Sequence, residues 1–153
     1  MGKGIKNPEF MNCIKKNKIR RFSPGKNLVK KELNIAEKDY SEAKESLGRN
    51  RYKWATIQAY YSMFHSARAL LYNENYRERS HYCLIAALKA LYVETGKLSI
   101  HFLENLQKGK GLRENADYYD EWSKIGAEEV VNVANDFLKK VKIILYDRKS
   151  GGV

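Results

Sequence analysis

The segment from residue 59 to residue 71, AYYSMFHSARALL, limits the possible folds of this chain more than any other stretch. Its larger apolar side chains recur every three or four residues, which is the period of one face of an α-helix. Small residues are interleaved with them: Ala59, Ser62, Ser66, Ala67 and Ala69. Because small side chains let a second helix approach closely, the pattern predicts a buried helix that packs tightly at an interface.

The same helical period appears in five segments, which cover most of the chain. They are residues 27–47, 52–72, 80–96, 99–119 and 123–146. Ser80 and Ser99 are predicted to cap the third and fourth helices, and Gly109 and Gly111 are predicted to interrupt the fourth. No segment alternates with period two for long enough to predict a strand. Since short connections favour antiparallel neighbours, the sequence predicts an all-α, up-and-down bundle of four or five helices.

Charge divides the chain unevenly. Residues 1–31 contain ten lysines or arginines and one acid, Glu9, so they carry +9 of the formal net charge of +11. We predict a basic, partly disordered arm over 1–26, a bundle over 27–148 and a tail over 149–153. Two interpretations of the arm remain open: a solvated tail, or a segment that attracts nucleic acid.

Several classes of protein are disfavoured by what the sequence contains. No apolar run approaches the roughly 20 residues of a membrane span, and the start of the chain has no apolar core of a secretory signal. The two cysteines, Cys13 and Cys83, do not suggest a disulfide framework, so a reducing cytoplasm is the simplest setting. The three histidines lack the spacing of a metal site, and neither a metal nor another cofactor is expected.

Three short segments, taken together, resemble one known family. They are residues 59–71 (AYYSMFHSARALL), 76–81 (YRERSH) and 112–118 (LRENADY). In this order they are similar to the HEPN-domain family of small prokaryotic proteins, in particular its UPF0332-like branch, over residues 30–145. The resemblance implies an antiparallel helical bundle, commonly a homodimer. It also implies a minimal nucleotidyltransferase as partner, in a toxin–antitoxin-type pair.

The resemblance also brings a possible activity, from which this sequence departs. Many family members are metal-independent ribonucleases with an arginine followed, after four to six residues, by a histidine. Here no histidine follows Arg113; Tyr118 stands where one could lie, and a phenol with a pKa near 10 is a poor base at neutral pH. Arg77 precedes His81 by one residue too few. The sequence therefore favours a binding partner over an enzyme, with a ribonuclease toxin of rearranged active site as the alternative.

Six residues form the predicted site for a nucleotide or RNA phosphate: Arg77, Ser80, His81, Arg113, Asp117 and Tyr118. Arg113 would make a bidentate phosphate contact, with Asp117 holding its guanidinium and His81 donating a hydrogen bond. Tyr118 would pack against a base or ribose, or accept a nucleotidyl group, as a tyrosine near this motif does in some relatives.

Structural interpretations of the same residues remain open. Arg113 and Asp117, four residues apart, would form an ordinary ion pair along a helix. His81 would cover a helix end, His65 would be a packed core histidine, and Tyr118 would be half-buried packing.

Overall fold

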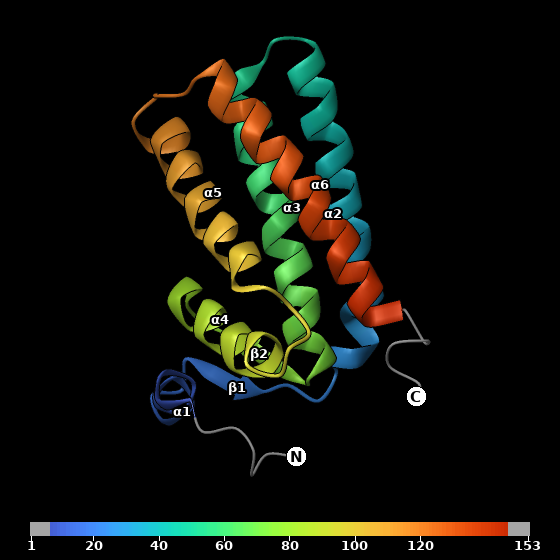
Figure 1. Ribbon diagram of the computed structural model, residues 1–153, viewed down its shortest axis with the longest axis vertical. Coiled ribbons are helices and arrows are strands. Elements are labelled where there is room, and N and C mark those ends of the chain that lie inside the picture. The colour runs from blue at the N-terminus through green and yellow to red at the C-terminus, as the bar shows by residue number, and fades with distance from the viewer. Residues whose placement is uncertain (1–6, 147–153) are drawn as a thin grey trace.

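The computed structural model describes residues 7–146. The helices are α1 (Pro8–Lys15), α2 (Gly25–Gly48), α3 (Tyr52–Asn73), α4 (His81–Leu88), the π-helix η2 (Lys89–Val93), α5 (Ile100–Tyr118) and α6 (Lys124–Tyr146), and the strands are β1 (Ile19–Arg21) and β2 (Tyr76–Glu78). The four long helices, α2, α3, α5 and α6, run up and down along the length of the molecule, and the short elements gather at one end (Figure 1). The predicted all-α bundle is confirmed.

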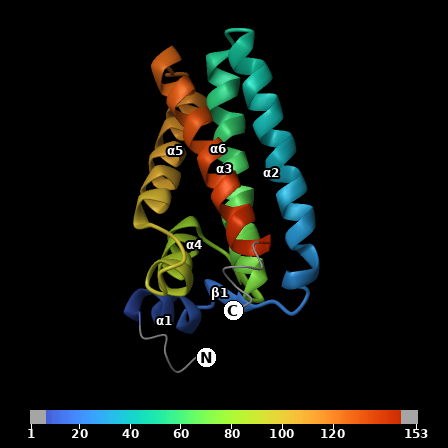
Figure 2. The ribbon, with the colours of Figure 1, turned by 45° about the vertical axis from the view of Figure 1, so that its right-hand side comes forward.

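Helix α3 is the centre of the bundle, with α2, α5 and α6 packed around it (Figure 2). Its small residues allow α2 to approach closely, because the Ser62 hydroxyl donates a hydrogen bond of 2.8 Å to the carbonyl of Ala36. Ala59, Ser62 and Ser66 are fully buried within this one chain. The predicted tight interface is therefore the contact between α2 and α3, and the small residues do not provide a surface for a second copy.

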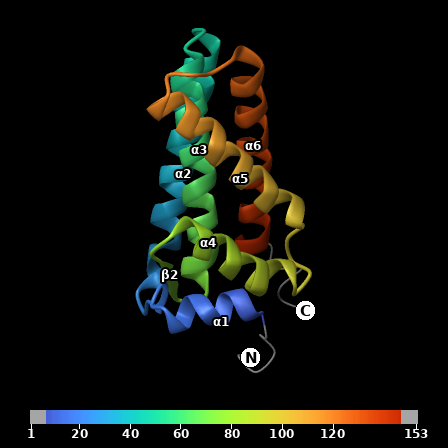
Figure 3. The ribbon, with the colours of Figure 1, turned by 90° about the vertical axis from the view of Figure 1, so that its left-hand side faces the viewer.

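Two serines begin helices as expected. The side chain of Ser80 accepts a hydrogen bond from the backbone N–H of Cys83, and that of Ser99 accepts one from His101. The expected interruption of the fourth helix is wrong, since α5 continues through Gly109 and Gly111 and crosses the bundle obliquely (Figure 3). Gly109 is buried against α3, where an added Cβ would lie 2.6 Å from Cε of Met63. This glycine is thus required by close packing and does not break the helix.

The N-terminal segment is folded onto the bundle. Helix α1 begins at the cap Asn7 and buries Phe10 and Cys13, and β1 pairs antiparallel with β2 in a two-stranded ribbon. Residues 8–15 and 19–21 of the predicted basic arm thus form α1 and β1, and the expectation that no strand would form is wrong. Local patterning missed β1 because each strand has three residues and is held by its partner from elsewhere in the chain. Residues 1–6, 147 and 148, and the predicted tail at 149–153, lie outside the described residues.

A disulfide joins α1 to α4. Cys13 and Cys83 are bonded, with their Cα atoms 5.8 Å apart, and the two side chains are buried. The expectation that the two cysteines would stay unpaired is wrong, because the number of cysteines does not reveal that α1 folds back beside α4.

Within residues 7–146, no helix is both long and apolar enough to cross a membrane. The same part of the chain contains no group of histidine, cysteine, aspartate or glutamate side chains arranged to bind a metal ion.

Candidate phosphate-binding site

Arg113 projects from α5 into a cage of tyrosine rings. Its guanidinium carbon lies 5.6 Å from the ring centre of Tyr60, 5.2 Å from that of Tyr61 and 5.3 Å from that of Tyr118. It donates hydrogen bonds to the hydroxyl groups of Tyr61 and, at 3.3 Å, Tyr118. Tyrosine faces stabilise a cation by their quadrupole and leave its charge uncancelled. The cage therefore orients a positive charge without neutralising it.

Asp117 contributes less to this arrangement than the sequence predicted. Its nearest carboxylate oxygen lies 4.0 Å from Nε of Arg113, beyond hydrogen-bonding distance. The Nε atom itself is buried and has no hydrogen-bond partner among the described residues. Arg113 is thus held by tyrosine hydroxyls, while Asp117 stands at the edge of the site.

His81 lies on the other side of Tyr60. Its Nδ1 atom is 3.2 Å from the Tyr60 hydroxyl oxygen, and its Nε2 atom is buried without a partner in the described part of the chain. Burial, together with the nearby charges of Lys110 and Arg113, lowers the pKa of His81 to about 4. The imidazole is therefore neutral at neutral pH and can donate or accept a hydrogen bond without carrying charge.

Tyr60 links the two candidate residues from its place on α3. Burial raises the pKa of its phenol to about 12, despite the opposing effect of Arg113, so the hydroxyl stays protonated. Sequence reasoning missed Tyr60 and Tyr61 as site residues, because it assigned this segment to close packing between helices. The available signal was the pair of adjacent tyrosines, since polar tips on a buried stripe need partners.

A shallow depression of about 320 Å³ opens beside His81. It is lined by His81, Tyr82, Gln107, Lys110, Gly111 and Glu114. Lys110 and Glu114, one turn apart on α5, form an ion pair of 2.8 Å at its rim. The depression gives a ligand access to the face of α5 that carries these charges.

The remaining predicted site residues make other contacts. Arg77 is exposed on β2, with its guanidinium carbon 5.4 Å from the ring centre of Phe22. The Ser80 hydroxyl caps α4 through its contact with Cys83. The contacts of the described residues thus join Arg113 to Tyr118 directly and to His81 through Tyr60. They place Arg77 on the ribbon and Ser80 in a helix cap.

His65 is a packed histidine, as one of the two interpretations of the sequence predicted. Its Nδ1 atom lies 2.7 Å from the buried carboxylate of Glu32, between α3 and α2. It therefore stabilises the contact of two helices and has no part in the tyrosine cage.

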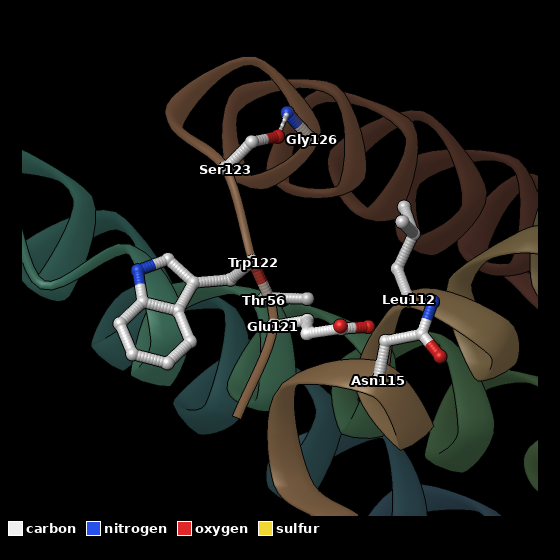
Figure 4. A pocket seen from close by; sticks show the side chains of 7 residues that line it. All are labelled: Thr56, Leu112, Asn115, Glu121, Trp122, Ser123 and Gly126. Atoms are coloured by element: carbon white, nitrogen blue, oxygen red, sulfur yellow. Dashed lines mark hydrogen bonds between the residues drawn. The ribbon is translucent and has the colours of Figure 1, made fainter. Parts of the chain in front are cut away.

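A second hollow, of about 250 Å³, lies where the loop between α5 and α6 crosses the end of α3. Trp122 and Leu112 lie on opposite sides of it, with Thr56 and Glu121 between them (Figure 4). None of the six predicted site residues lines this hollow.

Comparison with known proteins identifies the family. The model of the HEPN domain matches residues 29–144. The chain belongs to the HEPN domain family. This match runs from α2 to α6 and includes the tyrosine cage and His81, whereas α1 and β1 precede it.

Three relatives agree with this assignment. The chain is 32% identical over 111 residues to the candidate toxin MJ0605 of Methanocaldococcus jannaschii. The matched region covers 72% of this chain and 83% of the relative. It is 26% identical over 122 residues to a second candidate toxin of that organism, MJ0142. This match covers 78% of this chain and 83% of the relative. It is 33% identical over 109 residues to a UPF0332 protein of Archaeoglobus fulgidus. This match covers 70% of this chain and 86% of the relative. These similarities are consistent with the UPF0332-like branch of the HEPN family.

Proposed function

We propose that this HEPN protein is the partner of a minimal nucleotidyltransferase in a toxin–antitoxin-type system, and that its tyrosine cage binds the phosphate of a nucleotide or RNA. The toxin–antitoxin part of the proposal is supported by the HEPN match and by the two relatives named as candidate toxins. We further propose that it acts as a homodimer, as members of this family commonly do.

The proposal rests chiefly on the unused hydrogen-bond donors of the Arg113 guanidinium. Two of the five N–H groups of its guanidinium are used by Tyr61 and Tyr118, and no carboxylate within residues 7–146 hydrogen-bonds to it. A partly buried guanidinium with unused donors favours an oxyanion, because the planar fork of arginine matches phosphate oxygens. The Tyr118 hydroxyl can be displaced easily, since 65% of that residue is exposed.

Binding of AMP, measured by isothermal titration calorimetry, tests the site. We expect Arg113→Ala to lower the affinity at least tenfold, because it removes a charge-assisted contact of about 1.5–3 kcal/mol. Arg49→Ala is the matched control, since Arg49 is exposed just after α2 in an ion pair with Glu45. Wild-type affinity of a folded Arg113→Ala variant would refute the proposed site.

Tyr118 is proposed as the acceptor when the partner transfers a nucleotidyl group. Its hydroxyl oxygen would attack the α-phosphorus of a nucleoside triphosphate, form a phosphodiester, and release pyrophosphate and a proton. Arg113, 3.3 Å from that oxygen, lies where it would neutralise the new phosphate. Mass spectrometry after incubation with the nucleotidyltransferase and ATP should find one adenylyl group, which Tyr118→Phe abolishes and Tyr119→Phe leaves in place. An adenylyl group on Tyr119 alone would show that the proposed acceptor is wrong.

A ribonuclease remains the second candidate, because the structure brings His81 and Arg113 to opposite sides of the same tyrosine. Against it, a histidine with a pKa of about 4 is protonated in about one molecule in a thousand at neutral pH and is a poor general acid. Incubation of purified protein with RNA in EDTA should therefore give no cleavage. Cleavage that Arg113→Ala abolishes would establish the enzyme instead.

A further inference from the structure

We propose that the outward face of the β1–β2 ribbon is a second anion site, which binds the phosphate backbone of a nucleic acid. Four cationic residues form this face: Lys18, Arg20, Arg77 and Arg79. We call them the cationic quartet. They lie outside the tyrosine cage, and two of them precede the residues that match the HEPN model.

The geometry of the ribbon brings the quartet together. Arg20 and Arg77 are direct partners across the two strands, and the N–H of Arg79 donates a hydrogen bond of 2.8 Å to the carbonyl of Lys18. Side chains alternate between the faces of a strand, so Ile19 and Glu78 point into the protein, where both are buried. The quartet therefore lies on the opposite face, and all four residues are exposed.

This charge is not balanced within the described part of the chain. None of the ion pairs there involves a member of the quartet. The one acid on the ribbon, Glu78, is buried and paired with Arg68. Like charges directly across a strand pair destabilise a sheet. The fold thus carries a cost that an external polyanion would relieve.

An aromatic ring beside the quartet holds one of its arginine side chains in place. Arg77 lies over Phe22, with its guanidinium carbon 5.4 Å from the ring centre. An ordered guanidinium loses less side-chain entropy when it binds a phosphate. Further exposed cations flank the ribbon in sequence: Lys15, Lys16 and Lys26. The outward face of the ribbon is therefore basic, and one of its arginines is already ordered.

Continuity with the first site favours a nucleic acid over an acidic protein. Arg79 is two residues before His81, so the end of β2 leads into α4 and the depression beside it; β2 and the start of α4 lie next to each other in Figure 3. A nucleic acid, with a phosphate at every nucleotide, can occupy the ribbon and the depression at once. This continuity rests on the proposed function of the tyrosine cage, whereas the quartet itself does not.

Fluorescence anisotropy with labelled oligouridylate tests the proposal on the full chain. The four-fold variant Lys18→Gln, Arg20→Gln, Arg77→Gln, Arg79→Gln should bind at least tenfold more weakly. Its salt dependence should also flatten, by about 0.7 in the log–log slope for each phosphate that the protein no longer neutralises. The matched control changes four exposed lysines on α2 and α6 to glutamine: Lys38, Lys44, Lys124 and Lys139. The control should stay within about twofold of wild type, because it removes the same charge elsewhere.

Other arms separate the possible outcomes. If oligodeoxythymidylate binds as tightly as oligouridylate, the protein recognises the phosphate backbone. If the quartet variant and the lysine control weaken binding equally, the effect is one of net charge, and the proposal is overturned. Equally tight, quartet-dependent binding of labelled polyglutamate would assign the surface to an acidic protein instead. The quartet variant should keep its affinity for AMP, and Arg113→Ala should keep a salt-dependent affinity for oligouridylate, so either site can fail alone. Thermal melting should show that the quartet variant is at least as stable as wild type, since repulsion between like charges is removed. If the four-fold variant does not fold, the double variant Arg20→Gln, Arg79→Gln is used in its place and judged by the same binding results.

Discussion

Gly109 and Gly111 provide a sharp test of how α5 is packed against the site. Both glycines lie in the interior of one helix, so alanine at either position should gain about 1 kcal/mol of helix propensity. They differ in surroundings: nothing lies within 4 Å of a Cβ added at Gly111, whereas one added at Gly109 would lie 2.6 Å from Cε of Met63 and 3.7 Å from Cδ1 of Tyr60. Met63 is completely buried, so its methyl group can move only by disturbing the core.

The expected free energies follow from these surroundings. Gly111→Ala should stabilise the protein by about 0.5–1 kcal/mol. Gly109→Ala should incur an overpacking cost of about 2 kcal/mol against the same gain, and so destabilise by about 1 kcal/mol. Urea denaturation measures both variants, and the predicted difference of about 2 kcal/mol corresponds to roughly 4–8 °C in Tm.

A double-variant cycle identifies the cause. In a Met63→Ala background the added methyl at Gly109 has room, so its cost should fall by about 1 kcal/mol or more. The tyrosine cage should also respond, because α5 carries Arg113 toward Tyr60, so Gly109→Ala should weaken AMP binding. Equal stabilisation by both alanines would show that α5 does not lie against α3 as closely as described.

Three further predictions concern the end of the bundle near α1 and α4. Cys13→Ser opens a disulfide whose cysteines are 70 residues apart, and loop entropy predicts a loss of about 4 kcal/mol, or about 10 °C in Tm; a strong reductant should lower the wild-type Tm equally and leave the variant unchanged. Because the pKa of His81 is lowered from 6.5 to about 4, the unfolded chain binds more protons between these values, so the stability held by neutral His81 is complete above about pH 6.5 and is lost as the pH falls toward 4. Since the ring is partly exposed, we expect about 1–2 kcal/mol, seen as a steeper acid loss in wild type than in His81→Gln; parallel pH profiles would contradict this. Ser80→Ala should cost about 1 kcal/mol in urea denaturation through loss of the α4 cap, and an unchanged midpoint would argue against that cap.

The sequence by itself determined the helical bundle and several of its helix starts. Apolar residues three and four apart define a helix face whatever that face contacts, and Ser80 and Ser99 cap their own helices through bonds within three residues. The resemblance to the HEPN family pointed to Arg113 and Tyr118, five positions apart on one segment, and their side chains do touch.

Only the tertiary structure decided which distant residues complete the site. Tyr60 and Tyr61 reach Arg113 because α5 crosses α3 at Gly109, and His81 reaches Tyr60 because α4 turns back across the bundle. The N-terminal segment shows the same limit, since β1 exists through its pairing with β2 and Cys13 meets Cys83 across 70 residues. Helix formation depends on neighbours a few residues away and can therefore be found in a sequence pattern. A short strand, a disulfide and a shared phosphate site depend on contacts between segments whose approach is set by the packing of the whole chain.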